Sequence, residues 1–344
     1  MSINKDKKLK RLMILSIPLV FLIICIGISV GSSNINIIDI ISIISYKLFN
    51  TNLLEGIEAK DVSIVWYIRL PRVLLSFIVG GALAASGAVV QSILKNPLAS
   101  PYTLGVSSGT SLGVGLLIVS GITIPFLGNL SLPIVGFICA LITMFLVLAF
   151  STKVDKKLSN TTIILTGMVF SLFFSAALTT LTALFTRKME TITMWQMGSF
   201  SNKGWSYLSA GVPFFLVGMI GIMIFSKEMD ILTFGEEEAK LMGVESEKVK
   251  KYLFILVAIL TGTAVSLSGT IGFVDLIAPH IVRKIFGANH KYVIPMSIVF
   301  GGCLMATTDL IARTIISPSE LPVGAVTAMI GAPFFAYLYF RKSK

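Results

Sequence analysis

Long apolar runs, separated by short polar or charged stretches, recur along the whole chain. An α-helix needs about 20 apolar residues to cross the hydrocarbon core of a bilayer. Ten runs approach or exceed that length, and three of them, 102–120, 207–225 and 272–285, are less regular than the others. The pattern predicts an all-α integral membrane protein with about ten transmembrane helices, at 12–30, 62–94, 102–120, 132–150, 161–185, 207–225, 252–268, 272–285, 292–315 and 323–340.

Prolines and small residues add detail to this pattern. Pro71 and Pro279 lie inside the second and eighth runs and are expected to interrupt those helices. Small residues recur at helical spacing in the second and third runs, which favours close packing of helix backbones in lipid. A weakly amphipathic run at 35–49 is expected to lie at the membrane interface.

Lysine and arginine residues are unevenly distributed over the polar stretches. If the N-terminus is cytoplasmic and the segments alternate, 20 of the 28 Lys and Arg residues face the cytoplasm. This bias supports the orientation, an even number of crossings and two cytoplasmic termini. The basic stretch 5–11 is also typical of a signal peptide. However, the run that follows it is long and ends without a clean cleavage site, so a first transmembrane helix is favoured.

Composition excludes several classes of protein. Hydrophobic residues make up 55% of the chain and charged residues 13%, whereas soluble domains carry about 25% charged residues. The net charge of +11 lies between apolar runs and forms no basic stripe with interleaved aromatic residues, so no nucleic-acid partner is expected. Cys25, Cys139 and Cys303 lie in apolar runs without a CxxC pair, so we expect free thiols and no metal site.

Catalytic motifs are absent from the sequence. There is no GxxxxGK[ST] phosphate-binding loop, no HExxH and no arrangement typical of a catalytic triad. The two histidines, His280 and His290, lack metal-ligand spacing. We therefore expect no enzyme activity and no cofactor in this chain, so any ATP hydrolysis belongs to a separate partner.

Two arginines lie near the outer end of the second run, and two prolines follow its inner end. Arg69 and Arg72 lie at its outer end, where anchoring in the lipid headgroups is one explanation. Pro97 and Pro101 force a non-helical turn at its inner end, before a glycine-rich run returns through the membrane.

Two further charged features lie in the second half of the chain. Asp309 and Arg313 are spaced i,i+4 near the outer end of the ninth run, which favours a salt bridge between them. In the loop 234–251, three consecutive glutamates open a short amphipathic helix that Gly243 can end in a left-handed cap. From composition alone, this loop is a solvated connection.

Several motifs follow one another in a fixed order along the chain. They are RLPRVLLSFIVGGALAASGAVVQSILKNPLASPYTLGVSSG at 69–109, WQMGS at 195–199, GEEEAKLMGV at 235–244, IGFV at 271–274, APHIVR at 278–283 and ELPVGAVTAMIGAPFF at 320–335. Their order resembles that of the FecCD-type permeases, the membrane subunits of importers for iron-siderophores, haem and vitamin B12. The resemblance covers roughly residues 60–340.

The resemblance implies a fold and a set of partners. It implies a BtuC-like type II ABC importer permease, with residues 1–344 as a single transmembrane domain in the cell membrane. It further implies a homodimer with two ATP-binding subunits, an external substrate-binding protein and an iron-complex cargo, all in contact with membrane lipid.

The resemblance also implies functions for individual residues. The loop 234–251 would dock on the ATPase, and Arg69, Arg72 and Arg313 would dock the binding protein. Asn96 and Leu98 would form an inner gate facing Asn160 and Thr161. The residues implied in coupling to the ATPase are Gly235, Glu236, Glu237, Glu238, Ala239, Lys240, Leu241, Met242 and Gly243.

One position departs from the family pattern, and other functions stay open. Asp275 stands where the family usually has glycine; it is either a ligand contact or a helix cap, and the cap is favoured. The resemblance leaves vitamin B12 as an alternative cargo. An ion-coupled secondary transporter is a second class of function, for which Asp275 and Asp309 are the candidate buried acids.

Overall fold

All regular structure in the described part of the chain is helical. The computed structural model describes residues 3–31, 35–122 and 124–342. In chain order the elements are α1 (Ile3–Ser29), α2 (Ile37–Phe49), α3 (Ala59–Ser63), the π-helical η1 (Ile64–Arg69), α4 (Leu70–Ile93), η2 (Pro101–Leu104), α5 (Val106–Ser120), η3 (Gly128–Leu130), α6 (Ser131–Val154), α7 (Asn160–Leu184), α8 (Thr186–Met197), α9 (Trp205–Ile224), α10 (Ser226–Leu232), α11 (Glu236–Leu241), α12 (Ser246–Ser268), α13 (Val274–Phe286), α14 (His290–Thr314) and α15 (Val323–Lys342).

Within the described ranges, seven helical stretches are long and apolar enough to cross a membrane, so the chain is a multi-pass membrane protein. They coincide with seven of the predicted segments, and the irregular run at 207–225 is among them. The predicted segments at 102–120, 272–285 and 323–340 correspond to the helices α5, α13 and α15, which are not among the seven. The count of ten crossings therefore stays a prediction. The seven stretches are Leu9–Ser29, Ala59–Ile93, Gly128–Val154, Asn160–Leu184, Trp205–Ile224, Ser246–Ser268 and His290–Thr314.

Of the two expected proline interruptions, the one at Pro279 was wrong. The helix is continuous from Ala59 to Ile93, but it changes from the π-helical η1 to the α-helical α4 directly before Pro71, so the α-helical pattern is interrupted there. Pro279 lies inside α13, yet the helix continues to Phe286. A proline there leaves the carbonyl of Asp275, four residues earlier, without its helical partner. The side-chain amide of Gln91 donates to that carbonyl at 3.2 Å and replaces the lost hydrogen bond.

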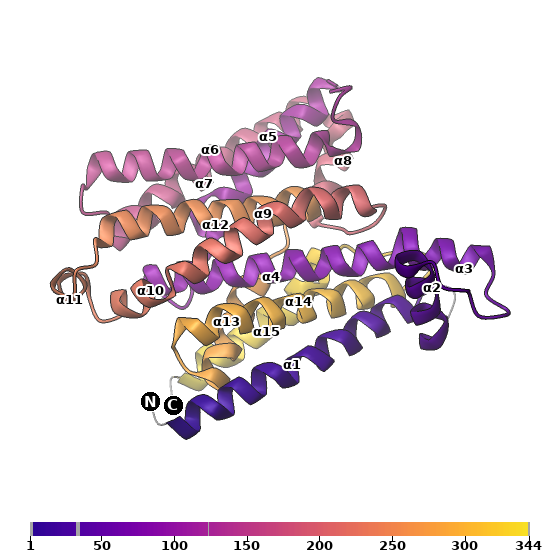
Figure 1. Cartoon of the computed structure of the whole chain (residues 1–344). Helices are drawn as coiled ribbons and strands as arrows, with labels where there is room; N and C mark the ends of the chain where they lie inside the picture. The colour runs from indigo at the N-terminus through magenta and orange to yellow at the C-terminus, as the bar shows by residue number, and fades with distance from the viewer. Residues whose placement is uncertain (1–2, 32–34, 123, 343–344) are drawn as a thin grey trace.

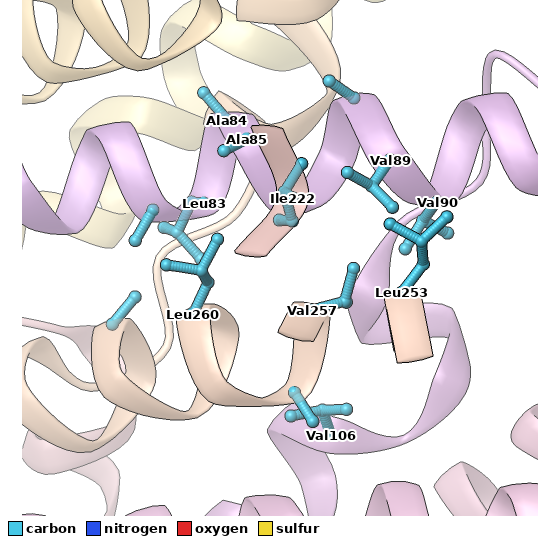
Figure 2. Close-up of a cluster of buried hydrophobic side chains, with 14 of the residues drawn as sticks. Leu83, Ala84, Ala85, Val89, Val90, Val106, Ile222, Leu253, Val257 and Leu260 are labelled. Carbon is cyan, nitrogen blue, oxygen red and sulfur yellow. The ribbon is translucent and has the colours of Figure 1, made fainter. Parts of the chain in front are cut away.

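Helix α4 forms the centre of the core. It packs against α9, α12, α13 and α14. Of the most apolar 18 residues in the continuous stretch Ala59–Ile93, 83% are buried. Leu83 and Val90 of α4 meet Leu253 and Leu260 of α12 in an apolar layer (Figure 2). On the α14 side, a Cβ on Gly80 would overlap the backbone carbonyl of Gly301. Small residues therefore let these two backbones approach closely, as the spacing predicts.

The two ends of the bundle differ in the elements that they carry. Helices α10 and α11 lie at one end, together with the start of α1 and the far end of α15 (Figure 1). Helices α2 and α3 lie at the opposite end (Figure 1). We call these the α11 end and the α3 end.

The two longest helices outside the predicted crossings are α2 and α8. The interfacial run expected at 35–49 forms α2, with Ile40 and Ile43 buried and Ile38 and Phe49 exposed. The structure also forms α8, which hydropathy does not predict because its mixture of basic, acidic and apolar residues gives no long apolar run.

Candidate functional site

Arg72 is the centre of a buried ion-pair network at the α3 end. Its guanidinium donates to both carboxylate oxygens of Asp309, at 2.8 and 3.0 Å, and to both oxygens of Glu320, at 2.8 and 3.0 Å. The residue Asp309 is 1% exposed, whereas the Glu320 side chain is 35% exposed. Arg72 also holds the pKa of the Glu320 carboxyl below its ordinary value. The network joins α4, α14 and the loop before α15.

The other two predicted arginines contact the end of α1. The last carbonyls of a helix have no intrahelical partners and carry partial negative charge. Arg69 donates to the carbonyls of Ile28 and Ser29 at 2.8 and 3.0 Å, and Arg313 donates to the carbonyl of Gly27. Both arginines therefore cap α1.

This geometry corrects two expectations about the arginines. The i,i+4 spacing predicts that Asp309 holds Arg313, but Asp309 binds Arg72 on α4 instead. Headgroup anchoring does not account for Arg69 and Arg72, since they are 4% and 6% exposed and bind different neighbours within the protein. Spacing along one helix missed this because the partners lie on other helices.

The turn between α4 and α5 leaves the α-helical conformation, as Pro97 and Pro101 predict, and its second half forms the short 3-10 helix η2. The Asn96 side chain accepts from the amide of Leu98 at 2.9 Å, and Ser100 accepts from the amide of Tyr102 at 3.1 Å. Gly105 ends the turn with φ of +82°, a left-handed conformation that favours glycine.

Asp275 contacts this turn from α13. It lies in the first turn of that helix and is 1% exposed, but Phe273 occupies the N-cap position and no side chain caps the helix there, so the cap interpretation was wrong. The Asp275 carboxylate accepts a hydrogen bond from the hydroxyl of Ser100, a contact that the sequence does not predict. Asp275 therefore fixes the turn to the helix that packs beside it.

A cavity of about 460 Å³ opens between this turn and α7. Asn96 and Leu98 line this cavity, and Leu98 is 49% exposed. Asn160 and Thr161 do not line it; they begin α7, whose Ile164 lines it one turn further along. The four predicted gate residues therefore belong to two elements that meet at one cavity.

A second cavity, of about 400 Å³, shares Tyr102 and Ser171 with the first. Of its described lining residues, none is charged and most carry hydroxyl groups. The sequence analysis missed it, although one signal exists: polar residues recur every three or four positions along one face of the apolar helix α7. The hydroxyl and amide residues that line this second cavity are Tyr102, Ser107, Ser108, Ser111, Ser171, Ser175, Thr179, Thr182, Thr193, Gln196 and Thr270.

Helix α11 ends in a left-handed glycine cap. Gly243 has φ of +82°, and its amide donates to the carbonyl of Lys240 at 3.0 Å. The amide of Val244 donates to the carbonyl of Ala239 at 2.9 Å, which completes a Schellman motif. The left-handed cap predicted at Gly243 is therefore confirmed.

Three large apolar side chains are exposed in or next to α11, among charged ones. Leu241 is 90% exposed, Met242 62% and Phe234 72%, beside the glutamates 236–238. The buried Ala239 holds the opposite side of the helix against the rest of the chain.

Comparison with known proteins identifies the family of this chain. The model of the FecCD transport family matches residues 19–341. The chain belongs to the FecCD transport family. The motifs at 69–109, 235–244 and 320–335 all lie within the matched range, so the resemblance seen in the sequence is confirmed.

Relatives within the FecCD family are permease subunits of ABC transporters. The chain is 41% identical to the uncharacterized ABC transporter permease YvrB of Bacillus subtilis, over 93% of this chain and 91% of that one. It is 35% identical to the hemin transport system permease HmuU of Yersinia pestis, over 93% and 94%. Other FecCD relatives are named for import of cobalamin, ferric citrate, ferric hydroxamate and molybdate.

A solved structure of the same fold supports the assignment. It is an inward-facing conformation of a transporter assigned to the metal-chelate ABC type. The TM-score is 0.83 at 30% identity, and the match covers 96% of this chain and 99% of that one. Within the ranges that the structure describes, this FecCD chain has no cluster of His, Cys, Asp or Glu that could hold a metal ion.

Proposed function

We propose that this chain is the permease subunit of an ATP-driven importer that moves an iron complex, a siderophore or haem, into the cytoplasm. It works as a homodimer, with two ATP-binding subunits at the α11 end and a substrate-binding protein at the α3 end. Each protomer crosses the membrane ten times, with both termini on the cytoplasmic side. The membership in the FecCD family and the hydroxyl-lined cavity carry this proposal.

The hydroxyl-lined cavity favours a polar chelate as cargo. Hydroxyl groups both donate and accept hydrogen bonds and carry no charge, so they can contact oxygen-rich ligands without trapping them. Thr179 and Thr182 already donate to carbonyls of their own helix, so their oxygens remain as acceptors. Removing water from these hydroxyl groups therefore costs little free energy. Relatives named for ferric citrate, ferric hydroxamate and hemin support iron, and a relative named for cobalamin supports the alternative.

A cargo panel tests the proposal. The permease, its ATPase and its binding protein would be reconstituted in liposomes and supplied with ferric siderophores, haem, cobalamin or molybdate. We expect uptake of a ferric siderophore or haem to exceed uptake of the others by about tenfold or more. Preferred uptake of cobalamin would favour the alternative, and preferred uptake of molybdate would contradict both.

The exposed apolar face of α11 supports the coupling proposal. Phe234, Leu241 and Met242 lie beside the glutamates of α11, which is at one end of the bundle (Figure 1). If these apolar side chains contacted lipid, the neighbouring carboxylates would also enter the bilayer. Apolar side chains that protrude from a charged surface are typical of protein interfaces. We assign this face to the ATPase.

The cavity between the turn and α7 supports the gate proposal. Leu98 points from one element and α7 forms the opposite wall, so a shift between the two would change its width. In an importer, the inner gate must close when the outer side is open.

Cysteine crosslinking tests the gate. Leu98→Cys in both subunits, with Cys25, Cys139 and Cys303 replaced by serine, is expected to crosslink in one nucleotide state and poorly in another. Met168→Cys is the matched control on the facing wall of the same cavity. Equal crosslinking of position 98 in every nucleotide state would remove this residue from the gate.

The arginine network sets how a binding protein can dock. Arg69 and Arg72 are buried, so a partner at the α3 end would meet the exposed edge of the network, at Glu320 and the half-buried Arg313. The two deeper arginines would act by holding that edge in place.

An ion-coupled secondary transporter has less support. Such transporters use buried acids that are free to change protonation or to bind an ion. Asp309 accepts three hydrogen bonds from Arg72, and Asp275 accepts one from Ser100 at a single carboxylate oxygen.

A further inference from the structure

Lys250 is a fully buried lysine at the α11 end of the molecule. It lies on the second turn of α12, and the residue is 1% exposed. Its ammonium group has three N–H donors, and three acceptors surround it. These are the carbonyl of Leu158 at 3.1 Å, the side-chain oxygen of Asn160 at 3.0 Å and the carboxylate of Glu236 at 2.5 Å.

The three acceptors come from two separate parts of the chain. Glu236 is the first residue of α11, the helix that we assign to the ATPase. Asn160 is the first residue of α7, which forms one wall of the gate cavity, and Leu158 lies in the turn just before it. The ammonium group of Lys250, on α12, therefore connects α11 with α7.

Neighbouring ion pairs in the same loop are different in kind. Lys248 pairs with Glu245 at 2.6 Å, but both side chains are more than 60% exposed. Lys240 and Glu247, 3.5 Å apart, are also largely exposed. Exposed pairs of this kind contribute little and break easily, because water replaces either partner.

Burial makes the Lys250 contacts hard to break one at a time. A buried ammonium is costly unless it is paired and hydrogen-bonded. Of the described carboxylates, only that of Glu236 lies within ion-pair distance. If α11 moved alone, Glu236 would leave the ammonium without its anionic partner. A movement in which Lys250, Leu158 and Asn160 move together with α11 keeps the ion pair and therefore costs less free energy.

We propose that Lys250 is a positioning residue that transmits displacement of α11 to the start of α7, and so to the inner gate. This inference rests on the proposed function of the two helices. Glu236 receives the displacement, the ammonium keeps α12 in register with α11, and Asn160 passes the displacement to the cavity wall through Ile164, one turn along α7.

The transport test compares Lys250→Met with Lys248→Met in the reconstituted complex. Methionine keeps most of the length of the side chain and removes the charge. We expect Lys250→Met to lower the number of cargo molecules moved per ATP hydrolysed by about tenfold, as loss of a typical coupling between two sites would. It should also remove the nucleotide dependence of crosslinking at position 98. Lys248→Met should retain both, and a wild-type ratio in Lys250→Met would overturn the proposal.

A second measurement tests the link without transport. Hydrogen exchange in the full-length permease should show faster exchange in both 158–162 and 236–242 when Lys250 is methionine, and in neither when Lys248 is methionine. Glu236→Gln, which removes only the charge, should give the same pattern at smaller amplitude and serves if Lys250→Met does not fold. Exchange that rises in one segment alone would overturn the link. A native complex without ATP-driven uptake would instead remove the proposed function.

Discussion

Replacing Arg72 with alanine is expected to lower the free energy of unfolding by about 3–5 kcal/mol, the usual cost of removing one partner from a buried ion pair. Asp309 is 1% exposed, and its carboxylate would lose every hydrogen bond that Arg72 donates to it. Thermal unfolding of the purified permease in detergent would measure the change as a large drop in melting temperature and in the yield of folded protein.

Two control variants separate the buried contact from the exposed one. Glu320→Gln removes the charge of the partly exposed partner and should have a much smaller effect, because solvent screens that pair. Arg72→Met combined with Asp309→Leu removes both buried charges and should recover most of the lost stability. If the double variant is as unstable as Arg72→Ala, the ion pair is not the source of the loss.

The same double variant also tests docking. It keeps the fold while it removes the guanidinium from the α3 end, so association with the binding protein can be measured directly. Because Arg72 is buried, we expect association to weaken only modestly and mainly through the position of Glu320. Complete loss of association in a folded double variant would instead make Arg72 a direct docking contact.

Replacing Gly243 with valine is expected to reduce uptake strongly while the ATPase remains active. A β-branched residue in the left-handed conformation costs about 1–3 kcal/mol. Gly243 has φ of +82° with open space around its Cβ position, so the strain is in the backbone and not a clash. The Schellman cap would open and change the end of α11, where the exposed Leu241 and Met242 lie. Uptake and ATP hydrolysis measured in the same vesicles would show the two rates diverging.

Gly243→Asn is the matched control for this variant. Asparagine tolerates the left-handed conformation better than any β-branched residue, so it should retain most of the uptake. Equal uptake by the valine variant and the native protein would show that the cap does not matter for coupling. Equal loss in both variants would point to the glycine surface itself and not to its backbone conformation.

The sequence predicts the helices well because lipid imposes a strong and local constraint. Each long apolar run had to become a helix, since no other backbone satisfies its own hydrogen bonds in a bilayer. The turn at Pro97 and Pro101 and the cap at Gly243 were also predictable, because each depends on the conformational limits of one residue. Pro279 misled the prediction, because Gln91 on another helix repairs the hydrogen bond that proline removes.

Side-chain partners were much harder to predict than helices. Asp309 and Arg313 have ideal spacing on one helix, yet Arg72, distant in sequence, takes the carboxylate. Lys250 gave no signal at all: it looks like one more lysine in a basic run, and only the packing of α7, α11 and α12 shows what it contacts. The family resemblance supplied the gate and coupling residues, which helical periodicity alone does not identify.

The source of energy is the claim on which the proposed function depends most. Liposomes that contain the permease, its ATPase and its binding protein would be given an iron-55 chelate with ATP, with ADP, or with a proton or sodium gradient and no nucleotide. Accumulation of iron-55 above the external concentration is predicted only with ATP and only when all three proteins are present. Accumulation driven by an ion gradient without ATP, or by the permease alone, would contradict the account.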